Sequence, residues 1–385
     1  MRRILIFSLA YYPSFVSGAE AAIKEITDRI NPEDIEFHMV THLFDKAAPR
    51  EERIGTVHVH RVGFGNAYLS KIFFVPLAAR KARSLERTVG VDAIWCMMTY
   101  MLFPLALARL IGVRAPHVLT LQDGDPYEKV FRRWFIRLFV PLLDYGFRTA
   151  SVIQVISKYL ATWPVRRGYR GEVVLVKNGA NLNDLKQAFS QAEIEKTQHE
   201  LGKKEGDIFL VNTSRLVHQK GIDTTIEALQ YLPEHVKFVA VGAGADEEKL
   251  KALTERLGLA GRVIFTGRVD RSVVTLYRRA CDIFVAPSRS EGLGNAFVSA
   301  LASKLPLVTS GVGGIADYAV DGETAWLVPP DDPKALAEKI KEVIANPEKA
   351  HEISERARAM VERDYDWDKI ALQMREKVFG KVLPA

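Results

Sequence analysis

Runs of apolar residues alternate with longer stretches of helical periodicity along the whole chain. The runs are rich in Val, Ile and Leu and are mostly continuous, as expected for strands buried on both faces of a parallel sheet. Between them, apolar residues recur at intervals of three and four positions, the spacing of amphipathic helices. The pattern predicts an α/β protein built from parallel sheets that helices cover on both faces.

The predicted strands form two successive series, which indicates two Rossmann-like domains. The first series is RILIFSL, IEFHMVT, TVHVHRV, AIWCMM, HVLTL, SVIQVIS and EVVLVKNG, and the second is IFLVNTS, VKFVAVG, RVIFTG, IFVAPS, LPLVTS and AWLVPP. We expect the first domain over residues 1–182, a polar linker region over 183–206, the second domain over 207–362 and a closing helix over 363–385. Doubly wound sheets bind ligands beyond the carboxyl ends of their strands, so the expected site is a cleft between the two domains.

The composition is that of a globular protein, with 48% hydrophobic and 26% charged residues among 385. Both cysteines, Cys96 and Cys281, lie inside apolar runs and are expected to be reduced thiols. No apolar stretch reaches the roughly 18 residues that a membrane-spanning helix needs. The opening MRRILIFSLA is interpreted as a buried strand and not a signal peptide, because YYPSF follows it in place of a small-residue cleavage site. We therefore expect a cytoplasmic protein.

Positive charge is concentrated in the first half of the chain. Residues 1–180 carry 25 Lys and Arg against 16 Asp and Glu, whereas the remainder carries 28 against 31. This asymmetry indicates an anionic partner for the first half. No zinc finger, RNP motif or uninterrupted basic arm is present, so no nucleic-acid partner is expected and a lipid surface is favoured. The segment Lys129–Thr149 fits either an interfacial helix, which would place the protein on the inner face of the membrane, or a core helix.

Turns after predicted strands carry the candidate binding residues. In YYPSFVSGAEAAI, Gly18 precedes a helix whose N–H groups can face an anion, and an ordinary turn is the alternative. In NTSRLVHQKGIDTT, Arg215 and Lys220 lie five residues apart across a turn. Two such cations suit a diphosphate, and a solvated pair is the alternative.

Two further turns are weaker signals. Gly242 and Gly244 in VAVGAGAD make only a partial glycine motif, which gives little support to a nicotinamide cofactor. Arg268 and Val269 in IFTGRVD follow another strand, where backbone groups can pair with the edge of a base. A plain turn is the alternative there.

The stretch PSRSEGLGNAFVSALASKLPLV combines a carboxylate, a glycine-bearing turn and a helix that Pro306 stops. The N-terminus of this helix presents unpaired N–H groups to an anion. Glu291, in the turn, can accept hydrogen bonds from sugar hydroxyls. Asn295 and Ser299 are four residues apart and share the polar face of the helix.

Taken in order, these motifs resemble those of the GT-B glycosyltransferases of family 4, which are retaining enzymes that use nucleotide sugars. The resemblance covers nearly the whole chain and includes YYPSFVSGAE, VVLVKNGANLNDL, SRLVHQKGID, VGAG, FTGRV, GVGGIADYAVDGETAWLVPP and DYDWDKIALQMREKVF. It implies the GT-B fold, in which two Rossmann-like domains face each other across a cleft and a C-terminal helix crosses back to the first domain. It also implies a UDP- or GDP-sugar as substrate, no cofactor and no required metal.

The resemblance implies a role for each candidate residue. Arg215 and Lys220 would neutralise the donor diphosphate and Glu291 would hold the sugar hydroxyls, so these three are the expected catalytic residues. The expected donor-binding residues are Gly18, Gly244, Arg268, Val269, Gly292, Leu293, Gly294, Asn295 and Ser299. Gln122 and Asp123 are candidates for contact with the acceptor or the sugar. In retaining members the leaving phosphate is thought to help deprotonate the acceptor, so no protein nucleophile is required.

Three positions depart from the pattern of the family. Ser299 stands in place of a glutamate that holds the nucleotide ribose, Lys304 in place of a glycine, and Gln122 in place of a histidine. Replacing a charged hydrogen bond by a neutral one costs about 1 kcal/mol, or roughly tenfold in affinity. A weakly active or non-catalytic binding homologue therefore remains an alternative.

Two features resemble metal sites, although no metal site is predicted. The DGD at Asp123–Asp125 is similar to a metal-binding motif of another glycosyltransferase fold, and a turn after a strand also explains it. His58 and His60 alternate along TVHVHRV and point to one side. Because no third ligand is evident, we expect an exposed strand face there.

The sequence thus predicts an enzyme that moves a hexose from a nucleotide sugar to a glycan or lipid-linked acceptor in the synthesis of cell-surface glycans. It would be cytoplasmic, with peripheral membrane contact through its basic N-terminal domain. A non-catalytic sugar- or nucleotide-binding homologue and a GT-B epimerase or phosphorylase are the alternatives.

Overall fold

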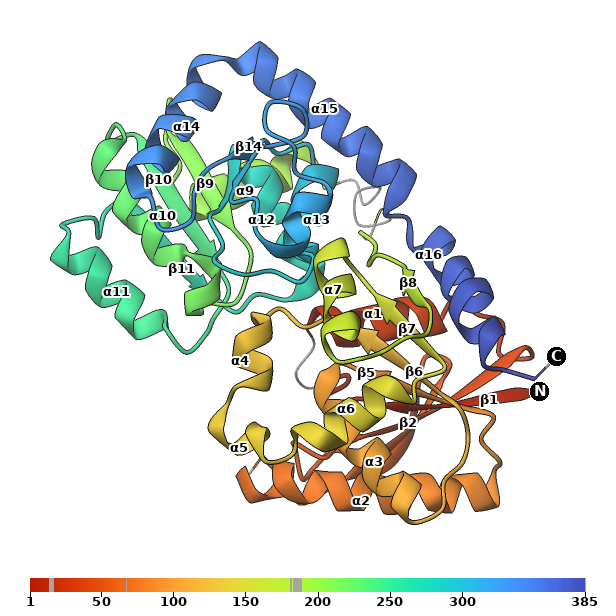
Figure 1. The fold of residues 1–385 in the computed structure, drawn as a ribbon. Helices are drawn as coiled ribbons and strands as arrows, with labels where there is room; N and C mark the ends of the chain where they lie inside the picture. Colours follow the sequence, from red (N-terminus) through yellow and green to blue (C-terminus); the bar gives the residue numbers. More distant parts are fainter. Residues whose placement is uncertain (14–16, 67, 181, 183–188, 385) are drawn as a thin grey trace. The chain divides into compact units, whose positions relative to one another are not determined.

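The computed structural model describes residues 1–13, 17–66, 68–180, 182 and 189–384 of the chain (Figure 1). They divide into two compact units: Met1–Asn178 together with Trp367–Ala385, and Gly179–Asp366. The sequence places the corresponding boundaries at 182 and 362. Residues 183–188 of the expected linker and residues 14–16 of the YYPSFVSGAE motif lie outside the described part of the chain.

The first unit is built on one sheet, for which the described residues supply eight strands in the order β3-β4-β2-β1-β5-β6-β7-β8. All neighbours pair in parallel except β3 with β4. The strands are β1 Arg2–Phe7, β2 Ile35–His42, β3 Glu51–Ile54, β4 Val57–Val62, β5 Ala93–Met97, β6 His117–Leu121, β7 Val152–Val155 and β8 Val173–Leu175. The sequence pattern misses β3, because its residues EERI are polar and it lies at the sheet edge with no buried residue.

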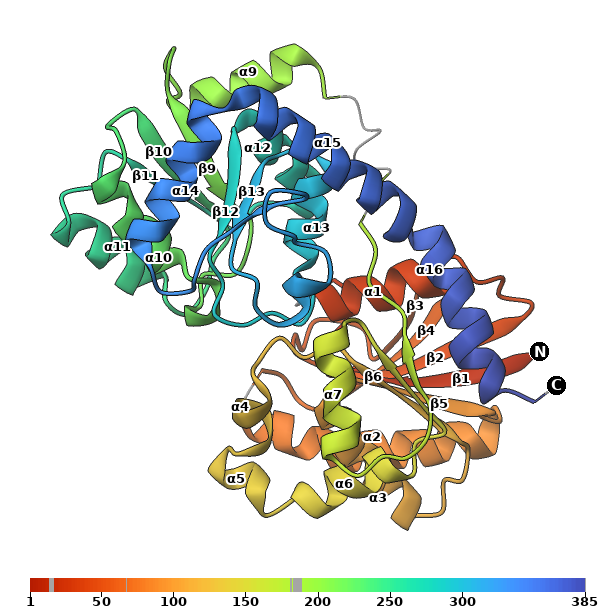
Figure 2. The ribbon, with the colours of Figure 1, turned by 45° about the horizontal axis from the view of Figure 1, so that its top comes forward.

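Helices cover both faces of this sheet. They are α1 Gly18–Thr27, α2 Tyr68–Thr88, α3 Leu102–Leu110, α4 Tyr127–Phe131, α5 Trp134–Arg137, α6 Val140–Arg148, α7 Lys158–Arg166 and α16 Trp367–Gln373. Figure 2 shows α1 and α16 on one face, and α2, α3 and α6 on the other. The expected closing helix therefore returns to the first unit, where Trp367, Ile370 and Met374 join the apolar core beside Ile26 and Phe37.

The second unit has a fully parallel sheet, for which the described residues supply six strands in the order β11-β10-β9-β12-β13-β14. The strands are β9 Ile208–Asn212, β10 Val236–Val241, β11 Val263–Gly267, β12 Ile283–Ala286, β13 Leu307–Thr309 and β14 Trp326–Leu327. The helices are α9 Gln191–Glu200, α10 Ile222–Ala228, α11 Glu247–Arg256, α12 Val274–Ala280, α13 Asn295–Ala302, α14 Pro333–Ala345 and α15 Pro347–Asp364. The prediction of two Rossmann-like α/β units is confirmed.

Part of the expected linker is helical. Helix α9 begins with a capping box in which Ser190 and Glu193 satisfy each other's backbone N–H groups. It packs on α12. Because only Thr197 of this helix is buried, its sequence shows little apolar periodicity.

Candidate functional site

The candidate residues of the second unit gather at one edge of its sheet. Arg215 and Lys220 follow β9, Gly244 follows β10, Arg268 and Val269 follow β11, and Glu291, Gly292, Leu293, Gly294 and Asn295 follow β12. These four strands are neighbours and run parallel, so their carboxyl ends meet along one edge. The structure therefore brings together the turns that the sequence singled out in this unit.

Glu291 and Lys220 form an ion pair across 71 positions of sequence. The side chain of Glu291 is 6% exposed and that of Lys220 is 15% exposed. Ser288 Oγ also lies 3.4 Å from the Glu291 Oε1 atom that accepts from the lysine. An unpaired charge at such a depth is costly, so each of these two groups compensates the other.

Backbone packing holds the two turns of this pair together. Gly221 follows Lys220, has a φ of 64° and begins α10. A Cβ atom at Gly221 would lie 2.1 Å from the carbonyl oxygen of Pro287, closer than any side chain permits. The left-handed turn and the missing side chain therefore let the β9–α10 turn pack on the loop that carries Glu291.

Arg289 connects the same two turns through its side chain. Its guanidinium donates to both carboxylate oxygens of Asp223, at 2.9 and 2.8 Å, and to the carbonyl oxygen of His218 at 2.5 Å. The Nε atom also donates to Asp331 Oδ1 at 2.6 Å, and the Arg289 backbone N–H donates to the Gln219 carbonyl at 2.8 Å. A planar guanidinium suits this fork geometry. Arg289 is not among the residues predicted from the sequence, since its partners are scattered along the chain.

Helix α13 begins at Asn295, four residues after Glu291, with the left-handed Gly294 as its N-cap. Phe297, Val298, Ala300 and Leu301 form its buried side. Ser299 is partly exposed, and its hydroxyl donates to the Asn295 carbonyl at 2.9 Å within the helix. The Ser299 hydroxyl oxygen could therefore still accept a hydrogen bond from a ribose hydroxyl, but its own proton is already donated to the Asn295 carbonyl.

The remaining candidates of this unit differ in exposure. Gly244 packs against the β9–α10 turn, because a Cβ there would lie 2.1 Å from the Leu216 carbonyl oxygen. Arg215 and Arg268 are exposed. Lys304, which stands where the resemblance implies glycine, has a φ of 62°, the left-handed conformation that glycine adopts without strain.

Gln122 and Asp123 follow β6 in the first unit. Gln122 Oε1 accepts a hydrogen bond from the Asn178 side chain at 2.8 Å. Asp123 is buried, and its Oδ2 atom accepts from the Thr99 hydroxyl at 3.0 Å. Burial raises the pKa of the Asp123 carboxyl to about 6, although the Thr99 hydrogen bond acts in the opposite direction.

Gly18 was expected to precede a helix and is itself the first residue of α1, where an acid already occupies the helix end. The Glu20 carboxylate accepts from the Ser17 backbone N–H at 2.7 Å and from the Ser17 hydroxyl at 2.5 Å. Glu20 is buried. The helix end at which an anion was expected therefore already holds this carboxylate, a contact that the capping-box spacing of Ser17 and Glu20 indicates in the sequence.

The features that resemble metal sites have other contacts. Asp125 pairs with Lys129 and Arg133, each at 3.0 Å. The expectation of an exposed face at His58 and His60 is wrong for His60, which is 12% exposed. Its ring stacks on the ring of His38 from β2. Strand β4, which carries His60, lies between β2 and the edge strand β3, so neighbours on both sides reduce its exposure. Across the described ranges, no cluster of three or more His, Cys, Asp or Glu suits a metal ion.

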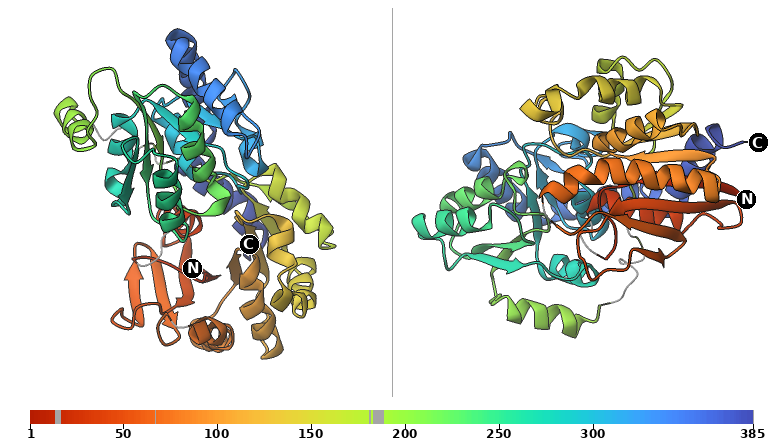
Figure 3. Two further views of the ribbon diagram at one scale, coloured as in Figure 1. Left: turned by 90° about the vertical axis from the view of Figure 1, so that its left-hand side faces the viewer. Right: turned by 90° about the horizontal axis from the view of Figure 1, so that it is seen from below.

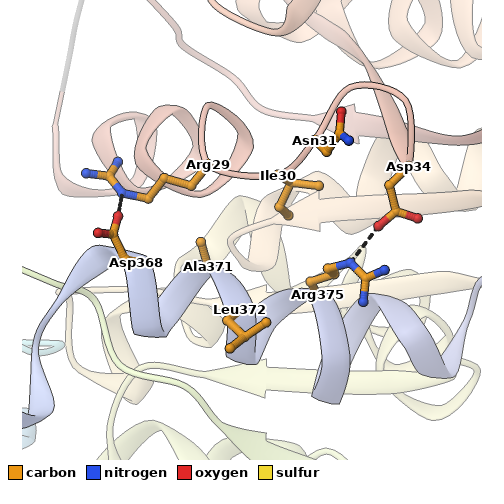
Figure 4. Close-up of a pocket in the computed structure, with 8 residues that line it drawn as sticks. All are labelled: Arg29, Ile30, Asn31, Asp34, Asp368, Ala371, Leu372 and Arg375. Carbon is orange, nitrogen blue, oxygen red and sulfur yellow. Dashed lines mark hydrogen bonds and ion pairs between the residues drawn. The ribbon is translucent and has the colours of Figure 1, made fainter.

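A pocket lies in the first unit, away from the strand ends that carry the candidates. It is lined by residues that follow α1, by residues of α16 and by Arg375, which lies just after α16 (Figure 4). Arg29 pairs with Asp368 at 2.7 Å, and Arg375 pairs with Asp34 at 2.5 Å. The α1–β2 connection enters the sheet where strands begin, so this pocket is at the opposite edge from Gln122 and Asp123. Its ion pairs fasten the closing helix to the unit.

Comparisons with known proteins match both units. A family model described as "Glycosyl transferase 4-like domain" matches residues 17–179, and one described as "Glycosyl transferases group 1" matches residues 193–360. An uncharacterized glycosyltransferase of Methanocaldococcus jannaschii is 24% identical over 95% of each chain. The D-rhamnosyltransferase WbpZ of Pseudomonas aeruginosa is 26% identical over 93% of this chain and 90% of its own.

Solved structures show the same fold. A sucrose-phosphate synthase from Thermosynechococcus elongatus superposes with a TM-score of 0.87 at 20% identity, over 99% of each chain. Anabaena HepE, solved in complex with UDP-glucose, superposes with a TM-score of 0.81 at 24% identity, over 99% of this chain and 100% of its own.

Proposed function

The chain belongs to the GT-B glycosyltransferases of the family 4 type, and from this premise we propose that it is a retaining enzyme that transfers a hexose from a UDP- or GDP-sugar. The proposed acceptor is a glycan or a lipid-linked glycan in the synthesis of cell-surface glycans. The observation that carries this proposal is the buried Lys220–Glu291 pair, at the strand edge that also presents Arg215.

The pair explains how one site can hold both a diphosphate and a sugar. The lysine charge is balanced by Glu291 in the ion pair. A bound diphosphate would give Lys220 a second anionic partner, and the Glu291 oxygens could then accept hydrogen bonds from sugar hydroxyls. Arg215, which is exposed, would add the second positive charge. Negative charge grows on the leaving phosphate as the glycosidic bond breaks, so cations placed there stabilise the transition state more than the ground state.

Each of the other candidate residues has a proposed role. Backbone N–H groups of Leu293, Gly294 and Asn295 would face the phosphate, and Arg268 and Val269 would border the base. Ser299 would accept from the ribose. On the first unit, Gly18 would approach the phosphates, and Gln122 and Asp123 would contact the sugar or the acceptor. No cofactor and no metal is assigned to the reaction.

Relatives and neighbours support a nucleotide-sugar donor. Anabaena HepE has been solved with UDP-glucose, and a mycobacterial relative, 28% identical over 50% of this chain, is named a GDP-mannose-dependent phosphatidylinositol monomannoside mannosyltransferase. A mannosyltransferase of lipopolysaccharide core synthesis from Rhizobium leguminosarum is 37% identical over 34% of this chain. These names favour a UDP- or GDP-hexose and a glycan or lipid acceptor for this chain.

The donor is tested by thermal shift with UDP-, GDP- and ADP-hexoses at millimolar concentration, followed by assays of nucleotide release with and without acceptors. We expect one nucleotide sugar to raise the melting temperature and its nucleotide to be released faster when an acceptor is present. If none of these donors stabilises the protein, the proposed function fails. Release that needs no separate acceptor would instead indicate an epimerase, and release that needs inorganic phosphate would indicate a phosphorylase.

Removal of either charge from the central pair should reduce transfer. We expect Lys220→Ala and Glu291→Ala each to lower kcat/KM at least tenfold, since each removes a donor contact and leaves its former partner buried and unpaired. Lys237→Ala is the matched control, because Lys237 forms a comparable pair with Asp207 at 2.6 Å near the other edge of the same sheet. Unchanged transfer in both site variants would contradict the assigned roles.

A further inference from the structure

The loop that carries Glu291 packs against the segment that follows the next strand of the sheet. The loop, residues 287–294, follows β12, and the segment, residues 310–318, follows β13. These two strands pair in parallel, so both connections leave the same edge of the sheet. Figure 3 (left) shows this sheet with helices on both of its faces. We call residues 287–294 the donor loop and residues 310–318 the backing segment.

The backing segment donates hydrogen bonds to carbonyl groups of the donor loop. The Gly314 N–H donates to the Glu291 carbonyl oxygen at 3.1 Å. The Tyr318 hydroxyl donates to the Leu293 carbonyl oxygen at 2.8 Å, across 25 positions of sequence. A Cβ atom at Gly294 would lie 3.0 Å from the Tyr318 hydroxyl oxygen, so the tyrosine also packs against the end of the loop. These contacts fix the directions in which the loop carbonyls point.

The Tyr318 hydroxyl is held in a buried position. Tyr318 is 2% exposed, and the buried ring of Tyr365 meets its ring edge-on, with centroids 6.1 Å apart. Burial raises the pKa of the Tyr318 hydroxyl well above its usual value, and the charge of Glu291 acts in the same direction. The hydroxyl therefore keeps its proton and remains a donor to Leu293 at physiological pH.

A bond to the Leu293 carbonyl also sets the direction of the Gly294 N–H. Both groups belong to one planar trans peptide unit, in which the C=O and the N–H point in opposite directions. The carbonyl points to the buried Tyr318, so the N–H points away from it, and Gly294 is partly exposed. Across the described residues, the Gly294 N–H donates to no protein acceptor. If this peptide rotated, its carbonyl oxygen would take the place of the N–H and repel an anion.

We propose that Tyr318 is a positioning residue, whose hydrogen bond holds the Leu293–Gly294 peptide so that the Gly294 N–H faces the donor diphosphate. The inference rests on the proposed function, in which backbone N–H groups of this loop face the phosphate. Tyr318 acts through the loop, because its side chain is buried behind it. An N–H that is already oriented needs no reorganisation when negative charge grows on the leaving phosphate, so it stabilises that charge more than a freely rotating peptide does.

The orientation of the peptide can be tested without a ligand. Leucine precedes glycine three times in the chain, at Leu201–Gly202, Leu257–Gly258 and Leu293–Gly294. Labelling the leucine carbonyl carbon and the glycine nitrogen with NMR-active isotopes therefore gives three coupled amide signals. We expect Tyr318→Phe to shift the Leu293–Gly294 signal, which is assigned by its absence in Leu293→Met, and to leave the other two in place. Tyr365→Phe is the matched control, since it removes a hydroxyl from the neighbouring buried ring and keeps the Tyr318 bond.

The phosphate contact is tested by titrating UDP, GDP and their nucleosides into the same proteins. We expect Tyr318→Phe to bind the nucleoside diphosphate about tenfold more weakly, the effect of one hydrogen bond to a charged group. Its affinity for the nucleoside should equal that of the wild type, because the base and the ribose do not use this peptide. Tyr365→Phe should bind both ligands like the wild type. A residue that only stabilised the fold would not separate the two affinities.

The outcomes distinguish a failure of this inference from a failure of the proposed function. The inference alone is overturned if the wild type binds UDP or GDP and Tyr318→Phe binds it equally well. It is also overturned if Tyr318→Phe weakens the diphosphate and the nucleoside by the same factor, or if the Leu293–Gly294 signal does not depend on Tyr318. A wild type that binds neither UDP nor GDP would overturn the proposed function and this inference together.

Discussion

At the scale of single residues, Ser299 is the departure from the family pattern with the clearest physical consequence. Its hydroxyl proton is used within α13 by the Asn295 carbonyl, so only its acceptor capacity is available to a ligand. The backbone position is otherwise suited to a longer side chain, since Ser299 is only partly buried. A carboxylate at this position could reach beyond the helix backbone and accept from a ribose.

Ser299→Glu is therefore expected to tighten binding of the donor nucleotide about tenfold, the difference between a neutral and a charged hydrogen bond. Calorimetric titration with the free nucleoside diphosphate measures this without turnover. Ser303→Glu is the control, one turn further along, where the wild-type hydroxyl also donates within the helix. Equal or weaker binding by Ser299→Glu would show that this position does not face the ribose.

Asp123 provides a second prediction at this scale, because its pKa is raised to about 6 by burial. A carboxyl with a raised folded-state pKa stabilises the protein fully below its unfolded pKa of about 4, and this contribution is lost as the pH rises through 6. Asn is uncharged at every pH, and its amide oxygen can still accept from Thr99. Asp123→Asn should thus stabilise the protein by about 3 kcal/mol at pH 7.5, the free energy equivalent to the pKa shift, and by almost nothing at pH 4.

Denaturant unfolding of Asp123→Asn and wild type at these two pH values measures the difference. Asp125→Asn serves as the comparison, since Asp125 pairs with Lys129 and Arg133 and should lose stability instead. A gain for Asp123→Asn that is the same at both pH values would contradict an origin in ionisation.

At the scale of elements, the hydrogen bonds of the Arg289 guanidinium hold the β9–α10 turn against the loop after β12. It joins Asp223, Asp331 and the His218 carbonyl, while Lys220 and Glu291 lie on the two turns that it connects. Arg289 touches neither of them, and we assign it as a positioning residue. Its removal should shift the two charges relative to each other without removing either.

Arg289→Ala is expected to lower kcat about tenfold with a smaller change in donor KM, because misplaced charges stabilise the transition state less. Arg289→Lys should restore only part of kcat, since an ammonium cannot reproduce the fork. Arg262→Ala is the control: Arg262 donates to carbonyls of Leu232, Pro233 and Val236 and lies away from the strand ends. If Arg289→Ala and Arg262→Ala both lower the melting temperature while kcat of Arg289→Ala is unchanged, the role of Arg289 is purely structural.

Elements also show what the sequence can and cannot predict. Buried parallel strands and the turns after them follow from local patterns, so Arg215, Lys220 and Glu291 could be selected before any fold was known. The polar edge strand β3 and the nearly unburied helix α9 have no such pattern. Contacts such as Lys220 with Glu291, Asp123 with Thr99 and His60 with His38 join distant positions, and only the sheet order brings them together.

At the scale of the whole molecule, each unit is an α/β layer whose stability depends on buried polar groups as well as on apolar packing. His117 begins β6 and is buried. Its Nε2 atom lies 2.9 Å from the Gly146 carbonyl oxygen and must donate to it, which leaves Nδ1 unprotonated and 3.4 Å from Arg109 Nη2. Burial lowers the pKa of His117 to about 4, and the nearby Arg109 adds to this, against the effect of the Gly146 hydrogen bond.

The first unit should therefore lose stability in acid through His117. A histidine whose folded-state pKa is below its unfolded value of about 6.5 stabilises the protein fully above pH 6.5, and that contribution is lost as the pH falls towards 4. The shift corresponds to about 3 kcal/mol. In His117→Gln an amide N–H can still donate to the Gly146 carbonyl, but the side chain takes up no proton. The stability of this variant should therefore fall less than that of the wild type between pH 7 and 4.

Urea unfolding followed by tryptophan fluorescence measures this difference, with His351→Gln, an exposed position on α15, as the control. Parallel pH curves for His117→Gln and the wild type would place the acid sensitivity elsewhere, with the stacked His38, whose pKa burial also lowers to about 4, as the next group to replace.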